Sequence, residues 1–156
     1  MRFIAILIML LWIFSCKSEN SAASHNNIVK GNTVIFTNTV SILNNNLEMW
    51  QPRIEDIENL IPKIKSFIEI NNNDSFGTEL AQKKENMIKY FNKYYIQCYG
   101  YILNGKRCIY FNFFLQSIKE WENQFIIIKD GGFSVWHIEF NTIDKVFYNY
   151  CVNGEA

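Results

Sequence analysis

The apolar positions between residues 54 and 68 recur in steps of three and four, which is the spacing of one face of an α-helix. They are Ile54, Ile57, Leu60, Ile61, Ile64, Phe67 and Ile68. Pro52 suits the first turn of this helix, and Pro62 predicts a kink or break near residues 59–61 because proline removes one backbone hydrogen bond. A second, narrower apolar stripe predicts a helix over residues 78–93.

After residue 94 the pattern changes to that of strands. Residues 94–103 and 106–115 flank Asn104-Gly105, a dipeptide typical of type I′ hairpin turns because both of its positions accept a positive φ. Residues 124–130 and 133–141 flank Gly131-Gly132 in the same way, which predicts a second hairpin.

Two more β-branched or aromatic segments complete the order of elements. Residues 33–43 predict a strand before the helices, and residues 146–152 predict a last strand. Helices followed by consecutive strands indicate an α+β domain, with the helices packed on one face of a curved antiparallel sheet.

The Asn104-Gly105 turn also divides the first hairpin into two faces, because it sets Leu103 opposite Lys106. The core face carries Ile96, Cys98, Gly100, Ile102, Ile109, Phe111 and Phe113, and Gly100 leaves space there for a large neighbour or for the helix. The other face carries Tyr95, Gln97, Tyr99, Tyr101, Cys108, Tyr110, Asn112 and Phe114.

The second predicted hairpin divides in the same way. Its expected core face carries Phe125, Ile127, Trp136, Ile138 and Phe140. Its other face carries Ile126, Ile128, Val135, His137 and Glu139. Which of the two faces of the sheet meets the helices is open at this point.

Composition indicates some classes of protein and excludes others. The chain has 156 residues, and 49% of them are hydrophobic, which is ample for one folded domain. Fifteen basic residues balance fifteen acidic ones, so no basic field exists to bind nucleic acid. No cysteine or histidine spacing resembles a zinc site, and the sequence predicts no metal and no cofactor.

The first sixteen residues have the layout of a secretory signal peptide: Arg2, an uncharged apolar run over residues 3–14, then Ser15 and Cys16. The run is shorter than the roughly 20 residues of a membrane span. Its end resembles the lipobox of bacterial lipoproteins, which implies a signal peptide over residues 1–15 and a lipidated Cys16. A plain signal peptide and an uncleaved anchor are the alternatives.

The lipoprotein interpretation divides the chain into three parts. A polar, Ser- and Asn-rich tether follows Cys16 as far as residue 32, and a single domain spans residues 33–156. Lys17 is not an acidic retention signal, so the resemblance favours the outer membrane over the inner one, facing the periplasm or the cell surface.

Three cysteines remain besides Cys16. Cys98 and Cys108 point to opposite faces of the hairpin and lie about 10 Å apart along it, so they are not expected to form a disulfide. Any disulfide in the domain must therefore use Cys151.

Several short motifs resemble a family of small bacterial lipoproteins of unassigned function with a cystatin-like/NTF2-like domain. They are Tyr99 within residues 97–100, Asn112, Asp130-Gly131-Gly132, Trp136 and the terminal residues 152–156. The resemblance implies a long helix cupped by a curved sheet, and it implies no activity.

The tyrosine-rich face is the first candidate for function. Tyrosine combines apolar area with a hydrogen-bonding end, as binding surfaces do. The expected binding residues are Tyr95, Gln97, Tyr99, Tyr101, Tyr110 and Asn112, with an envelope protein or a toxin as partner. The structural alternative is that tyrosines simply suit half-solvated strands, and a scaffold role within a larger envelope complex is also open.

An enzyme is the rival interpretation. His137 and Glu139 are two residues apart on one predicted strand, so their side chains point the same way. This suits a pair of proton-transfer groups in an NTF2-like pocket. An exposed neighbouring pair without catalysis is the simpler explanation, and a deep polar cavity containing His137 would favour the enzyme.

Overall fold

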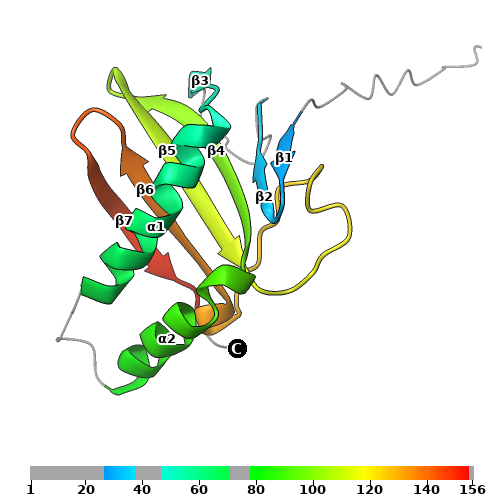
Figure 1. Cartoon of the computed structure of the whole chain (residues 1–156), viewed down its shortest axis with the longest axis vertical. Helices are drawn as coiled ribbons and strands as arrows, with labels where there is room; N and C mark the ends of the chain where they lie inside the picture. The colour runs from blue at the N-terminus through cyan, green and yellow to red at the C-terminus, as the bar shows by residue number, and fades with distance from the viewer. Residues whose placement is uncertain (1–26, 38–46, 71–77, 155–156) are drawn as a thin grey trace, which may run out of the picture.

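The computed structural model describes residues 27–37, 47–70 and 78–154. In these residues, helices α1 (Ile54–Ile70) and α2 (Thr78–Lys89) lie on the same face of a seven-stranded sheet, as Figure 1 shows. The predicted α+β class, with helices packed against a curved sheet, is confirmed.

The sheet has the order β1-β2-β4-β5-β6-β7, and the short β3 pairs with β4 beside β2. β2 runs parallel to β4, and the other strand pairs are antiparallel. The strands are β1 (Ile28–Lys30), β2 (Thr33–Ile35), β3 (Met49–Trp50), β4 (Tyr95–Leu103), β5 (Lys106–Phe114), β6 (Val135–Asn141) and β7 (Val146–Val152).

The β4–β5 hairpin has the predicted register. Leu103 pairs with Lys106, and the pairing continues without a slip to Tyr95 and Phe114. Asn104 and Gly105 both have positive φ, at 51° and 75°, as a type I′ turn requires. Cys98 and Cys108 are free thiols, in agreement with the register argument.

The second predicted hairpin is wrong. Residues 124–129 form no strand, and β6 pairs with β5 on one side and with β7 on the other. The backbone of Ile126 bonds to side chains instead of a strand, since its N–H donates to Gln97 and its carbonyl accepts from Asn112. Phe125 therefore lies away from the helices, and Ile127 is 57% exposed rather than in the core.

The N-terminal edge differs from the prediction as well. Residues 28–30, expected in the tether, form β1 and pair with β2 across Gly31, whose φ is 59°. The strand predicted over residues 33–43 ends at Ile35 in β2, and residues 38–46 of that prediction lie outside the described residues.

α1 is one continuous helix, so of the kink or break predicted near residues 59–61 the break does not occur. Pro62 is exposed, and the carbonyl left without its donor belongs to Glu58, which is exposed too. Water can bond that carbonyl, which lowers the cost of the missing hydrogen bond. The second predicted helix ends earlier than expected, because a 3₁₀ turn (Phe91–Lys93) follows α2.

The main core lies between the helices and the sheet. α1 contributes Ile57, Leu60, Ile64 and Ile68, which all belong to the predicted stripe. On the sheet side, the rings of Phe113 and Trp136 stack with centroids 3.8 Å apart, and Ile138 and Phe140 extend this layer along β6. The helices thus cover the face that carries Ile96, Cys98 and Phe111.

Gly100 of β4 receives the indole of Trp50, which is the large neighbour that the sequence anticipated. A Cβ atom on Gly100 would lie 2.4 Å from the Trp50 carbonyl oxygen and 2.8 Å from its ring. The Trp50 Nε1–H donates to the carbonyls of Tyr101 and Cys108, at 3.1 Å each. The absence of a side chain at Gly100 therefore leaves the space in which Trp50 packs against the sheet.

We expect Ile64→Ala to cost about 2–5 kcal/mol of unfolding free energy, because it opens a cavity in a fully buried site. The matched control is Ile70→Ala on the same helix, where the side chain is 79% exposed and the loss is expected to stay within about 0.5 kcal/mol. Urea unfolding measures both values. Equal losses at the two positions would contradict the packing of α1 described above.

Candidate functional site

The tyrosine-rich face of the β4–β5 hairpin is buried, which corrects the expectation of an open binding surface. A covering loop, residues 115–131, packs against it and forms a second core. Tyr99 is 3% exposed and Tyr101 5% exposed. The buried members of this core are Val34, Phe36, Tyr99, Tyr101, Cys108, Phe114, Trp121 and Val135.

Gln97 and Asn112 hold the covering loop by its backbone. The Gln97 Nε2 donates to the carbonyls of Trp121 (2.6 Å) and Gln124 (2.8 Å), and its Oε1 accepts from the N–H of Ile126 (2.8 Å). The Asn112 Nδ2 donates to the carbonyl of Ile126 at 2.9 Å. These two amides, expected to bind a partner, satisfy the chain's own loop.

The two remaining tyrosines of the expected surface are half-buried. The ring of Tyr95 stacks on Phe114, with centroids 5.7 Å apart. Tyr110 stacks between Tyr99 at 5.0 Å and His137 at 5.3 Å. Burial is the main cause that raises the pKa of both Tyr99 and Tyr110 above the ordinary value. These rings therefore belong to the packing of the sheet.

His137 and Glu139 share this loop-covered face, as the alternation predicted, but they make separate contacts. Burial lowers the pKa of His137 from its ordinary value, which favours the neutral ring. The Glu139 carboxylate accepts from Tyr101 and, at 3.1 Å, from Asn149. Among the described residues no hydrogen bond joins His137 to Glu139, and a register irregularity of the β6–β7 pair lies between them.

We expect Gln97→Leu to release the covering loop, because three backbone groups lose their partner in a buried setting, at about 1–3 kcal/mol each. Hydrogen exchange measures this directly, since the Ile126 amide should change from protected to fast. The control is Gln116→Leu, at an exposed position of the same loop. Unchanged protection of Ile126 in Gln97→Leu would refute the clamp.

A cleft lies on the other side of the sheet, where α1, β3, β5 and the β6–β7 turn meet. We name it the α1–sheet cleft; its volume is about 440 Å³. Its floor is apolar and its rim is polar. The lining residues are Trp50, Asp56, Asn59, Leu60, Lys63, Arg107, Ile109, Phe140, Thr142 and Lys145.

α1 supplies one wall of the cleft through a second stripe of helical spacing. Asp56, Asn59, Leu60 and Lys63 follow one another at intervals of three, one and three residues, so all four face the cleft. The Asp56 carboxylate is held by the Arg53 guanidinium through two contacts of 2.9 and 3.0 Å. The hydrogen bond from Arg53 lowers the pKa of Asp56, and Lys145 adds to this by its charge.

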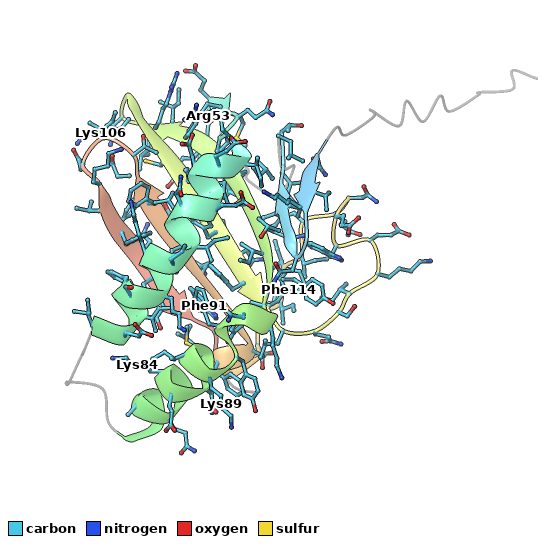
Figure 2. All side chains as sticks on the ribbon, in the orientation of Figure 1. Arg53, Lys84, Lys89, Phe91, Lys106 and Phe114 are labelled. Atoms are coloured by element: carbon cyan, nitrogen blue, oxygen red, sulfur yellow. The ribbon has the colours of Figure 1, made fainter. Side chains whose placement is uncertain are left out.

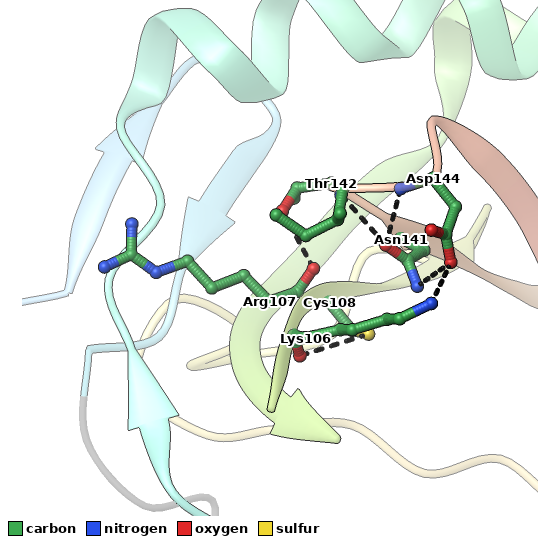
Figure 3. A network of polar contacts seen from close by, with 7 residues as sticks. Lys106, Arg107, Cys108, Asn141, Thr142 and Asp144 are labelled. Atoms are coloured by element: carbon green, nitrogen blue, oxygen red, sulfur yellow. Dashed lines mark hydrogen bonds and ion pairs between the residues drawn. The ribbon is translucent and has the colours of Figure 1, made fainter. Parts of the chain in front are cut away.

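The strands supply the opposite wall, where the β6–β7 turn is fastened to β5 (Figure 3). The backbone N–H and the hydroxyl of Thr142 both donate to the carbonyl of Arg107, at 2.9 Å each. The Asn141 Oδ1 accepts from the N–H groups of Ile143 and Asp144, which shapes the turn. Arg107 and Lys145 are thereby held on one side of the cleft.

The rim of the cleft carries an excess of positive charge. Within the described residues, no carboxylate oxygen lies within 4.0 Å of the charged nitrogens of Lys63, Arg107 or Lys145. Asp56 is the acidic lining residue, and Arg53 already engages it. The Arg107 guanidinium instead lies over the Trp50 ring, 5.3 Å from its centroid.

A smaller cleft of about 340 Å³ lies near the β4–β5 turn and the β6–β7 turn. Its lining includes Lys106, Cys108, Asp144 and Tyr148. Its cation is already paired, because the Lys106 Nζ lies 2.6 Å from the Asp144 carboxylate. Lys106 and Arg53 lie at the same end of the molecule in Figure 2, whereas Lys84 and Lys89 of α2 lie at the other end.

Sequence reasoning missed the α1–sheet cleft, since Lys63 and Arg107 look like ordinary solvated charges along the chain. The one signal was Gly100, which marked a large neighbour without identifying it as Trp50. The parts of the chain that the structure describes contain no cluster of three or more His, Cys, Asp or Glu side chains arranged to hold a metal. In residues 27–37, 47–70 and 78–154, no helix has the length and apolar character needed to cross a bilayer.

Comparisons with protein-family models, with curated proteins and with solved structures find no match to this chain. The candidate site therefore rests on its own geometry.

Proposed function

We propose that the protein is a lipid-anchored envelope protein that acts as a non-catalytic binding module, with the α1–sheet cleft as its binding site. The observation that carries this proposal is the combination of an apolar floor with unpaired charges in one cleft of about 440 Å³. That volume lies within the roughly 300–1,000 Å³ typical of pockets for small ligands.

The contents of the cleft favour binding over catalysis. Among the described residues, its lining includes no cysteine, histidine, serine or glutamate, and the aspartate there, Asp56, is held by Arg53. The proton-transfer pair of the rival interpretation, His137 and Glu139, lies on the opposite face of the sheet. A substrate in the cleft would therefore be separated from these groups by the sheet itself.

The burial of the tyrosines also changes the kind of partner proposed. The flat aromatic surface expected to meet an envelope protein or a toxin is covered by the chain's own loop. A cleft between a helix and a sheet suits a compact ligand better than a flat protein surface. The partner we propose is a small molecule or a protruding group of an envelope component.

The membrane anchor is proposed from the sequence, because Cys16 lies outside the described residues. The described chain begins at Asn27, whose Nδ2 donates to the carbonyl of Glu122 in the covering loop at 2.8 Å. β1 follows at once at the edge of the sheet, so the tether from Cys16 is shorter than residues 16–32.

We expect Cys16→Ser to move the protein from the membrane fraction to the soluble fraction, or to leave its precursor unprocessed, because the acyl acceptor is lost. Fractionation and gel mobility of the full-length chain measure both outcomes. Cys151→Ser is the matched control, since that thiol is exposed in the folded domain. Identical fractionation and mobility of Cys16→Ser and wild type would show that Cys16 is not the anchor.

Ligand binding in the cleft is tested with N-phenyl-1-naphthylamine, a neutral apolar dye that fluoresces when it leaves water. We expect Asn59→Trp to weaken dye binding at least about ten-fold, because the indole covers the mouth of the cleft. Glu69→Trp, on an exposed position of α1 ten residues further along, is the control and should bind as wild type does. Equal affinities for Asn59→Trp and wild type would remove the cleft as the binding site.

A further inference from the structure

The geometry points to a ligand class for the α1–sheet cleft: an amphipathic organic anion whose charged group contacts Lys63, Arg107 and Lys145. This inference rests on the proposed function, since it names what the same cleft binds. The ligand has an alkyl or aryl body that carries a carboxylate, sulfonate or phosphate. It is either a free molecule or the head region of a lipid.

Three cations from three different elements surround one concavity. Lys63 comes from α1, Arg107 from β5 and Lys145 from the β6–β7 turn. A cleft with low-dielectric walls and charges of one sign focuses its field on the space inside it. Because Asp56 is engaged by Arg53, the charge offered to a ligand is positive.

Arg107 is held in a way that leaves its hydrogen-bond donors free. The central carbon of its guanidinium lies over the Trp50 ring, 5.3 Å from the centroid. Among the described residues no carboxylate bonds to its N–H groups, which lie in the plane of the guanidinium. A guanidinium held over a ring in this way can still bind an anionic oxygen pair in a bidentate way.

The protein groups that support two of the cations, Arg107 and Lys145, are held in place by the fold. Trp50 is fixed by two hydrogen bonds of 3.1 Å and by its fit over Gly100, and it supports Arg107. The Lys145 backbone is fixed by its N–H bond to the Asn141 carbonyl at 2.9 Å and has a positive φ of 59°. A fixed ring beside Arg107 and a fixed backbone at Lys145 lower the entropy lost on binding, which favours affinity.

The floor of the cleft explains why the ligand needs an apolar body. Leu60, Ile109 and Phe140 are the buried residues that line it, and the Trp50 ring adds a partly buried aromatic edge. An inorganic anion would reach the cations but would leave the Trp50 ring, the partly buried part of this floor, in contact with water. A ligand that covers the floor gains about 25 cal/mol for each Å² of apolar surface that it removes from water.

The test compares two dyes that share one aromatic frame and differ in charge. N-phenyl-1-naphthylamine is neutral, and 1-anilinonaphthalene-8-sulfonate carries one sulfonate. We expect the purified full-length protein to bind the sulfonate at least about ten-fold more tightly, because its oxygens can accept charged hydrogen bonds from the cations. The sulfonate's affinity should fall with added salt, while that of the neutral dye should not.

Substitution identifies the charges responsible. Lys63→Gln combined with Arg107→Gln should abolish the preference for the sulfonate and leave the neutral dye bound within about two-fold. Lys129→Gln removes one exposed charge from the covering loop on the opposite face and should keep the preference. If the double variant melts at a lower temperature in circular dichroism, Lys145→Gln, a single change at an exposed position, tests the preference for the sulfonate instead.

Competition then tests the apolar body and the source of the ligand. Octyl phosphate should displace the sulfonate dye, and inorganic phosphate at the same concentration should not. Vesicles of phosphatidylglycerol in phosphatidylcholine will displace it if the natural source is a lipid head region, and will leave it bound if the source is a free amphiphile. Equal displacement by inorganic and octyl phosphate would overturn the requirement for an apolar body.

Two results would overturn the anion inference while leaving the proposed function intact. The first is equal affinity for both dyes. The second is a preference for the sulfonate that stays unchanged in the double variant and in Lys145→Gln. In each case Asn59→Trp must still block the neutral dye. If neither dye binds, or if Asn59→Trp blocks neither, the cleft is not a binding site and both proposals fail.

Discussion

The register of the β4–β5 hairpin is the constraint on which the rest of the structure depends. The Asn104-Gly105 turn sets this register, and each residue of the two strands is thereby committed to one face. A slip of one residue would move Gly100 away from Trp50 and would turn Gln97 toward the helices. The main core, the second core and one wall of the cleft all follow from the same pairing.

Both faces of this hairpin are buried, each by a different part of the chain. The helices cover one face, while the covering loop covers the other without forming a strand of its own. A loop laid over a sheet brings backbone N–H and C=O groups out of water, and each needs a partner. Gln97 and Asn112 supply those partners, which is why polar side chains occupy the middle of an aromatic face.

Trp50 links the fold to the proposed site. Its indole fits over Gly100, bonds to two carbonyls at the end of the hairpin and presents a face to Arg107. The β6–β7 turn is bonded to the same end of β5 through Thr142. The end of the sheet near these turns is therefore held by hydrogen bonds, and α1 crosses over it (Figure 1). The polar residues Asp56, Asn59 and Lys63 of α1 line the cleft there. The cleft is the space that this arrangement leaves between helix and sheet.

The sequence by itself determined the elements whose signals are local. The stripe of α1, the Asn104-Gly105 turn and the division of β4 and β5 into two faces follow from periodicity and turn chemistry, and the structure confirms them. Tertiary structure decided where residues 124–130 lie: their apolar pattern resembles that of a strand, but β6 pairs with β5 and β7 and not with them. The covering loop to which they belong packs over the tyrosines expected to bind. Tertiary structure also brings Lys63, Arg107 and Lys145 to one cleft. No local sequence pattern predicts this, because the three residues come from elements far apart along the chain.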